Sequence, residues 1–513
     1  METWIPLFVI LPLMAAFLTP VIGKVWPLFA KLAILVTTFI LTFFCVAAIF
    51  YWDKASLQYA VGGWKFYDQI PIGIFLVFDG LSGFLLGIVN LIAFLAAIYA
   101  SGYMEKFTSK GYFYTLLSLM VAGMNGVILS GDLFNLYVFL EIASIASYAL
   151  VAFGVEREEL EASFKYQVLG GLASLLILFS ISLLYWITGS LNLADVAMLL
   201  RQTPDNPAIL LTQVFFLAGF GLKAAVVPFH AWLPDAHSSA PSPISALLSG
   251  VLIKAIGVYV LIRLFFFVFE ISLPVAIVVT GLGLLSIIAG GLLAIGQQDY
   301  KRMLAYSSIS QIGYIFSGFG LAMLILASGG DQVVAGLAIF GGLFHLVNHA
   351  VFKSLMFMVA GAVEYATGIR ALDKLGGLSA EMPVTATTSL SGSLAISGLP
   401  PFGGFFSKLV IIIAAVQGQY YSVALVVGLM SVVTLAYFLK LQSKIFNTKL
   451  HMKLKKLIPV PYSMYLPMIF LASLSLLLSL LMIPAIRDLA MTPIVDSVIN
   501  YTSTLLTRTI PLP

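Results

Sequence analysis

Charged residues are scarce in this sequence. Asp, Glu, Lys and Arg make up only 9% of its 513 residues, whereas 61% are hydrophobic and the mean hydropathy is +1.07. About a quarter of the residues in a soluble globular protein are charged, so the composition excludes that class. It predicts a membrane protein with many spanning segments.

Cysteine is almost missing as well. The single cysteine, Cys45, lies within an apolar run, and one thiol cannot hold an iron–sulfur cluster, a disulfide or a c-type haem. The sequence also has no Gly-rich phosphate loop with its lysine. We therefore expect no cofactor and no metal in this chain. Whether it is part of an enzyme stays open, because any redox centre would belong to a partner.

Apolar runs of about 20 residues, the length that crosses roughly 30 Å of hydrocarbon, recur throughout the chain. The N-terminal run METWIPLFVILPLM carries an acid where a signal peptide carries basic residues, so we expect a first spanning helix and not a cleaved signal. The fold class is all-α, with about fourteen spanning helices. Their expected bounds are 4–22, 29–50, 72–100, 111–130, 133–153, 163–187, 208–229, 242–266, 273–296, 302–325, 332–364, 386–418, 420–443 and 462–485.

The distribution of Lys and Arg predicts the orientation. With the N-terminus outside, sixteen of the 26 basic residues fall on the inner side, Lys301 among them, and six fall outside, including Arg263. This bias is the one that the positive-inside rule expects. The basic residues from Lys440 to Lys456 form an expected inner surface near anionic lipid. The remaining four basic residues, Lys223, Lys254, Lys353 and Lys408, are expected within the membrane.

An ionisable residue at membrane depth costs roughly 2.5–3.5 kcal/mol on insertion scales and points to function. Lys223 and Lys254 lie on either side of a proline-rich connection in the stretch from Phe215 to Tyr259. Pro228 removes a backbone donor after Lys223 and breaks the helix. Freed backbone groups in a membrane need protein or water as partners, so the break predicts a hydrated cavity beside Lys223.

Four further residues carry open alternatives. Glu141 lies about 13 Å along its helix from the preceding turn, near mid-bilayer, and needs protonation or a cation such as Lys223; a purely structural ion pair is the alternative. His230 and His237 either relay protons to the inner surface or are ordinary polar loop residues. Asp79 is either a point where ions enter or an interfacial carboxylate that starts the third helix. The acidic run VEREELEASFK reads as a solvated loop.

His345, His349 and Lys353 recur every four residues, which places them on one helical face about 6 Å apart per step. This spacing suits a proton relay; the alternative is a polar seam that holds helices together. A metal site is disfavoured because no carboxylate or thiol stands among them.

The segment SLAISGLPPFGGFFSKLVIIIAAV is interrupted by Pro400 and Pro401 before Lys408. Two broken, lysine-bearing helices of opposite direction, the seventh and the twelfth, indicate an inverted repeat. The expected units are 1–110 (helices one to three), 111–266 (first repeat), 267–446 (second repeat) and 447–513 (basic loop, last helix and tail).

Four runs together carry a family resemblance: GDLFNLYVFLEIASIASY, GLKAAVVPFHAWLPDAHSSAPSPISALLSGVLIKAIGVY, FHLVNHAVFKSLMFMVAG and SGLPPFGGFFSK. The chain resembles the antiporter-like subunits of respiratory complex I, and most of all the D subunit of Mrp-type antiporters and its relatives in membrane-bound hydrogenases. The resemblance implies a core of two inverted five-helix bundles with helices seven and twelve broken. It implies that Glu141 and Lys223 form a gating pair, that Lys254, His345, His349 and Lys353 form a hydrophilic axis, and that Lys408 is the terminal proton donor.

The resulting hypothesis is a proton-translocating subunit of a multi-subunit complex in a prokaryotic cell membrane, either an Mrp-type Na+/H+ antiporter or a redox-driven pump such as a membrane-bound hydrogenase. Expected partners are further antiporter-like and small membrane subunits and the lipid bilayer, with no nucleic acid. Sodium is expected to pass largely through a neighbour, because the buried lysines repel it. The alternatives are a stand-alone secondary transporter and a structural membrane anchor.

Overall fold

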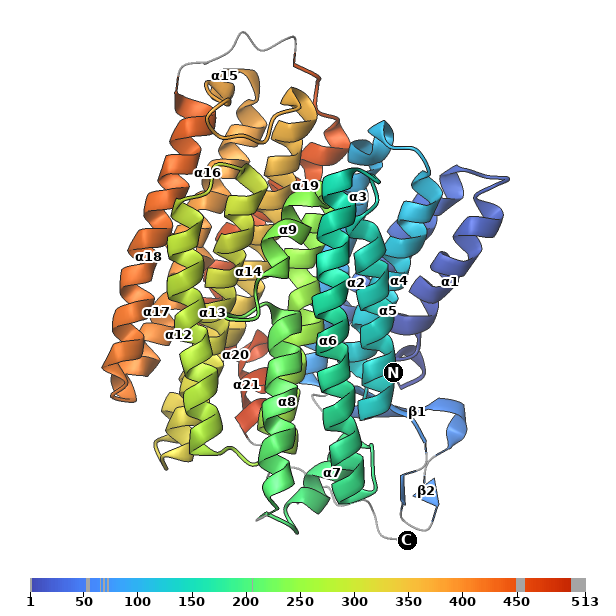
Figure 1. Cartoon of the computed structure of the whole chain (residues 1–513), viewed down its shortest axis with the longest axis vertical. Helices are drawn as coiled ribbons and strands as arrows, with labels where there is room; N and C mark the ends of the chain where they lie inside the picture. The colour runs from blue at the N-terminus through green and yellow to red at the C-terminus, as the bar shows by residue number, and fades with distance from the viewer. Residues whose placement is uncertain are drawn as a thin grey trace.

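The computed structural model describes residues 2–51, 56–64, 66–67, 70–71, 73–204, 206–448 and 457–499. Long helices run side by side through the whole molecule, with α1 and α18 at opposite sides of the bundle (Figure 1). Within the described residues, thirteen helices are long and apolar enough to cross a membrane. A further crossing is split in two at Pro400 and Pro401. The prediction of an all-α membrane protein with about fourteen crossings is confirmed.

Eight crossings form the first part of the bundle. They are α1 (Leu7–Ile22), α2 (Leu28–Tyr51), α3 (Gly80–Tyr103), α4 (Lys110–Leu129), α5 (Leu133–Val151), α6 (Arg157–Thr188), α8 (Pro207–Ala224) with α9 (Trp232–Ser239), and a composite helix of α10 (Ser242–Leu247), η4 (Leu248–Leu252), η5 (Lys254–Val258), α11 (Tyr259–Arg263) and η6 (Leu264–Val268). The segments η4, η5 and η6 are π-helical.

The other six crossings complete the bundle. They are α12 (Leu273–Ile295), α13 (Tyr300–Ala327), α14 (Gln332–Thr367), α16 (Pro383–Ser397) with α17 (Gly403–Gln417), α18 (Tyr421–Gln442) with η7 (Ser443–Asn447), and α19 (Tyr462–Leu477) with η8 (Leu478–Met482). Short helices lie outside them: η1 (Glu2–Trp4), η2 (Val61–Gly63), η3 (Met104–Lys106), α7 (Leu193–Leu200), α15 (Leu378–Glu381), α20 (Pro484–Ala490) and α21 (Thr492–Ile499).

Between α2 and α3 the chain forms small antiparallel pairs. β1 (Leu57–Ala60) pairs with β4 (Phe75–Phe78), and β2 (Phe66–Tyr67) pairs with β3 (Ile70–Pro71). The third helix was expected from residue 72, but β4 occupies that stretch and α3 begins at Gly80. Figure 1 places these strands at the same end of the bundle as the N-terminus and α7, opposite α15.

The acidic run VEREELEASFK is largely helical, so its interpretation as a solvated loop was wrong. α6 begins at Arg157, because Glu156 and Glu159 form a reciprocal capping box at its start. Glu158 and Glu159 in the first turn also suit the positive end of the helix dipole. Of the expected basic inner surface, Lys440 donates to the Ile295 carbonyl (3.0 Å) and Lys444 contacts Gln298 (3.4 Å). The lysines from Lys449 onward lie outside the described residues.

Both predicted breaks are present. After α8 the chain turns through Ala225 (φ 56°), and after α16 it turns through Gly398 (φ 78°). At the first break the indole N–H of Trp232 donates to the Leu222 carbonyl (2.9 Å) and the Val227 N–H donates to Ser286 Oγ (2.9 Å). Protein groups therefore satisfy backbone that would otherwise be unpaired at membrane depth.

Candidate functional site

Glu141 and Lys223 lie opposite each other on α5 and α8. The Lys223 ammonium is 3.8 Å from Glu141 Oε1, and the Lys223 and Glu141 side chains are 2% and 28% exposed, respectively. Lys223 donates hydrogen bonds to Ser144 Oγ (2.9 Å) and Tyr148 Oη (3.4 Å), while Ser174 Oγ donates to the Glu141 carboxylate. The two charges thus face each other without a short direct hydrogen bond. Each is held by hydroxyl groups.

Lys254 is fully buried at the start of η5. Its ammonium donates to the carbonyls of Ser249 and Gly250, both at 2.6 Å, in the adjacent η4 segment. A π turn displaces carbonyls from regular α-helical pairing, which makes them available to a side chain. Gly257 of the same segment lies directly against Ala224 of α8, so the elements that carry Lys223 and Lys254 are in contact.

The α14 face predicted as a relay is buried. His345 contacts Ser407 Oγ through Nδ1 (3.0 Å) and Gln311 Oε1 through Nε2 (3.2 Å). Lys353 donates to the Leu304 carbonyl of α13 (2.9 Å). These contacts hold α14 against α13 and α17, as a polar seam would. The geometry therefore fits both a proton relay and a polar seam between helices.

His349 differs from its neighbours on that face. Both of its ring nitrogens are buried and have no hydrogen-bond partner among the described residues. It interacts electrostatically with Lys254, Lys353 and His345. A buried polar group without a partner is rare in a static core, and it is the feature expected of a group that exchanges a proton or binds water.

Lys408 lies at the far end of this row. Its ammonium donates to the Ile396 carbonyl across the second break (2.7 Å) and lies 4.7 Å from the centre of the Tyr314 ring. Its charge acts on His345 and Lys353. Lys254, His349, Lys353, His345 and Lys408 therefore form one continuous group, which we call the buried axis.

The two histidines after the first break are placed differently. His237 lies in α9 and not in a loop; it is fully buried, and neither ring nitrogen has a hydrogen-bond partner in the described part of the chain. The charges of Lys353, Lys301 and Lys254 act on it. His230 is partly exposed, and its Nδ1 has no hydrogen-bond partner among the residues that the structure describes. The structure thus places His237, but not His230, at the edge of the buried axis.

Asp79 has the contacts of a structural carboxylate. It caps α3 by accepting from the Ser82 N–H (2.9 Å), and it accepts two hydrogen bonds from Arg263, one of them at 2.6 Å. Burial alone would raise the pKa of Asp79, but the Arg263 guanidinium lowers it below its usual value. Arg263 was counted on the outer side, near the end of the expected helix 242–266; it is buried in the composite helix instead.

Sequence reasoning missed two groups near α9. Lys301 was assigned to the inner surface because it precedes the expected start of a helix, yet its side chain is only 2% exposed. It donates to the Ala240 carbonyl (2.5 Å) and lies 3.9 Å from Glu364 of α14. Glu364 lies eleven residues after Lys353 on the same helix, so the sequence offered a signal for a second carboxylate beside the buried lysines. It was overlooked because it falls at the end of the expected helix 332–364.

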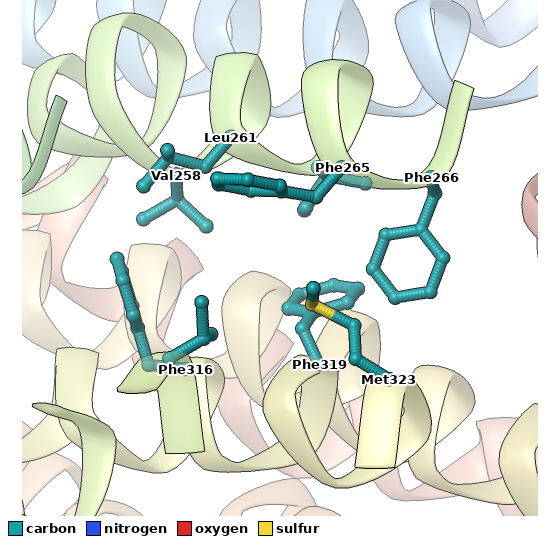
Figure 2. A pocket seen from close by; sticks show the side chains of 9 residues that line it. Val258, Leu261, Phe265, Phe266, Phe316, Phe319 and Met323 are labelled. Carbon is teal, nitrogen blue, oxygen red and sulfur yellow. The ribbon is translucent and has the colours of Figure 1, made fainter. Parts of the chain in front are cut away.

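A separate pocket lies between the composite helix, α12 and α13 (Figure 2). Nine apolar side chains line it, including Val258, Leu261, Phe265, Phe316, Phe319 and Met323. Figure 2 shows these side chains facing one another from two helices across the empty space. Such a lining offers an ion nothing to replace its hydration, so the pocket lies apart from any polar route.

Comparison with known proteins settles the family. A family described as NADH:quinone oxidoreductase/Mrp antiporter, TM, matches residues 130–434, more than half of the chain. The chain belongs to this family. The N-terminal region of complex I chain 5 (NADH-ubiquinone oxidoreductase) matches residues 64–114. The resemblance inferred from the four sequence runs is confirmed.

Relatives in the NADH:quinone oxidoreductase/Mrp family cover most of the chain. The N subunit of the NADH-quinone oxidoreductase of Desulforudis audaxviator is 39% identical over 75% of this chain and 74% of its own length. The D subunit of the Na(+)/H(+) antiporter of Alkalihalophilus pseudofirmus is 32% identical over 82% of this chain and 84% of its own length. Both breaks and the buried axis fall within the stretch matched by the family.

Two solved structures share the fold. One is the membrane-bound sulfane sulfur reductase, an archaeal respiratory membrane complex, with a TM-score of 0.87, 29% identity and coverage of 99% of this chain and 100% of that chain. The other is the Mrp complex from Dietzia sp. DQ12-45-1b, with a TM-score of 0.86, 25% identity and coverage of 98% and 99%. Both are complexes, and the chain matches one subunit of each along nearly its whole length.

Proposed function

We propose that this chain translocates protons as one subunit of a multi-subunit membrane complex. The observation that carries the proposal is the set of titratable groups inside the helix bundle: the Glu141–Lys223 pair and the five residues of the buried axis. Ionisable groups inside a membrane domain are costly and mark ion pathways. Relatives named as Na(+)/H(+) antiporter and NADH-quinone oxidoreductase subunits support the same conclusion.

The gating step follows from the loose geometry of the first pair. While Glu141 is ionised, its charge at 3.8 Å stabilises the Lys223 ammonium. When Glu141 is neutralised or displaced, the buried ammonium loses its counter-charge and releases its proton toward Lys254. α8 packs against η5 through Ala224 and Gly257, so this transfer crosses a direct contact between the two elements.

The later steps run along the buried axis. Lys254 and Lys353 both act on His349, which has free ring nitrogens in the described structure, so His349 connects the two lysines. His345 then leads to Lys408 through the contacts of α14 with α17. Each lysine of the buried axis is held by carbonyl oxygens and not by a carboxylate in a short ion pair, and a neutral acceptor does not lock the charged form.

The arrangement in the membrane is part of the same proposal. The N-terminus, β1 and β2 lie on the outside, and the face that carries α15 lies inside; the excess of basic residues toward that side supports this orientation. Residues 111–266 and 267–446 form the two inverted repeats, since Lys223 precedes its break and Lys408 follows its own. Neighbouring membrane subunits supply the energy and, where sodium is exchanged, most of its path.

The test is proton movement in membrane vesicles that contain the whole complex. Lys223→Ala and Glu141→Ala are compared with wild type at matched assembly, and Glu381→Gln, an exposed carboxylate in α15, serves as the control. We expect both gating-pair variants to lose most of the proton movement and the control to retain it. Unchanged movement in Lys223→Ala would refute the relay and favour a structural membrane anchor.

A further inference from the structure

Lys301 and Glu364 repeat the geometry of the gating pair. The ammonium-to-carboxylate distance is 3.9 Å here and 3.8 Å between Lys223 and Glu141. In both pairs the lysine side chain is 2% exposed, and the carboxylate is partly exposed, at 26% and 28%, respectively. Neither pair has the short contact of the Asp79–Arg263 bridge. The chain therefore contains a second loosely held carboxylate–lysine pair that the relay described above does not use.

Glu364 lies where water and the protein interior meet. Its Oε2 atom is buried and has no hydrogen-bond partner among the described residues, although a quarter of the side chain is exposed. Arg370 Nε lies 3.9 Å from the other oxygen. Structural buried carboxylates normally accept hydrogen bonds, and a buried carboxylate oxygen without one calls for another explanation. A carboxyl group that alternates between protonated and ionised forms provides one.

The pair leads toward the buried axis through His237. The Lys301 ammonium donates to the carbonyl of Ala240, which caps the helix that carries His237. His237 is fully buried with both ring nitrogens unpaired in the described structure. The charges of Lys353, Lys301 and Lys254 all act on it. His237 is thus within electrostatic reach of both the second pair and the buried axis.

We propose that Glu364 and Lys301 form the site where protons are taken up from the face of the membrane at which α13 begins, and that His237 passes them to Lys254 and Lys353. This inference rests on the proposed function. Glu364 takes a proton from water to become a carboxylic acid. The proton moves to the neutral amine of Lys301 and restores the carboxylate. The resulting ammonium gives a proton to one ring nitrogen of His237 and returns to the amine, while the other ring nitrogen gives its proton to a neutral axis lysine. His237 stays neutral overall because its burial and the surrounding lysine charges disfavour an imidazolium.

The experiment compares three complexes in vesicles at matched assembly: wild type, Glu364→Gln and the control Glu158→Gln. Glu158 is 83% exposed and contacts the same Arg370, so its variant removes a nearby negative charge without touching the pair. We expect Glu364→Gln to slow proton movement by about a hundredfold, the lower end of the range that an acid–base group contributes. The control should match wild type.

Rescue separates proton uptake from a structural role. Formic acid, a small weak acid, is added to Glu364→Ala vesicles on the face of the membrane at which α13 begins. It should restore part of the rate of proton movement, because it can carry protons to Lys301 where the carboxyl group is missing. A structural defect would not respond to it. Unchanged movement in Glu364→Gln, or a loss that formic acid does not relieve in Glu364→Ala, would overturn the proposal. If Glu364→Gln or Glu364→Ala fails to assemble, Glu364→Asp replaces it. A wild-type rate of proton movement in Glu364→Asp would also overturn the proposal.

Lys223→Ala, measured in the same vesicles, distinguishes a failure of the proposed uptake site from a failure of the proposed function. If Lys223→Ala abolishes movement while Glu364→Gln leaves it intact, only the uptake site is wrong. If neither variant changes the rate, the proposed function itself fails.

Discussion

At the scale of single residues, the chain holds its buried charges in two contrasting ways. Arg263 and Asp79 share two short hydrogen bonds, which fix both charges. Lys254, Lys353 and Lys408 instead donate to backbone carbonyls. A two-point ion pair locks protonation because either neutral partner would leave a buried charge unpaired, whereas a carbonyl accepts from an ammonium without requiring its charge. The same buried environment therefore contains fixed charges and exchangeable ones.

This contrast predicts a structural role for the Asp79–Arg263 bridge. Asp79→Asn leaves the Arg263 guanidinium buried without its carboxylate, so we expect a loss of about 3–5 kcal/mol and a lower thermal midpoint of the detergent-solubilised complex. The double variant Asp79→Leu, Arg263→Met removes both charges and should recover most of the stability. Proton movement in the double variant should approach wild type. A stable double variant that moves no protons would instead identify Asp79 as a point where ions enter.

At the scale of helices, sequence patterns predicted the features that depend on proline. Both breaks lie at the expected prolines, Pro228 and Pro400–Pro401, because proline cannot continue a helix. The π segments around Lys254 were not predicted, since a π turn depends on tertiary packing and leaves no periodic signature. The start of α6 was missed because two glutamates that look like loop residues form its cap.

The contact between α8 and η5 predicts the effect of a single methyl group. A Cβ at Gly257 would lie 2.8 Å from the Ala224 backbone, which cannot move aside as a flexible side chain would. Gly257→Ala should push α8 away from η5, cost about 1–3 kcal/mol and slow transfer between Lys223 and Lys254. Gly281→Ala in α12, where nothing lies within 4 Å, is the matched control. The rate of proton movement is measured for both variants in vesicles with equal amounts of assembled complex. Equal rates in Gly257→Ala and Gly281→Ala would show that this contact does not lie on the proton path.

At the scale of the whole molecule, the sequence located most of the buried axis but misplaced its surroundings. His345, His349 and Lys353 were found from their spacing alone, since a helix places every fourth residue on one face. Lys301 was assigned to the inner surface and Arg263 to the outer surface, because depth was judged from the distance to a helix end. Their burial depends on how α3, α9 and α14 pack around them, and no single stretch of sequence contains that information.

The resemblance to single subunits of larger assemblies predicts that this chain does not pump alone. Moving a proton against 100 mV requires about 2.3 kcal/mol, and the solved structures that match it are complexes in which further subunits are present. We expect purified chain in liposomes to show no proton movement when a sodium gradient is imposed, as followed by an internal pH-sensitive dye. Liposomes with the whole complex are the positive control, and an uncoupler confirms that both preparations are sealed. Sodium-driven acidification by the chain alone, lost in Lys223→Ala, would establish the stand-alone transporter instead.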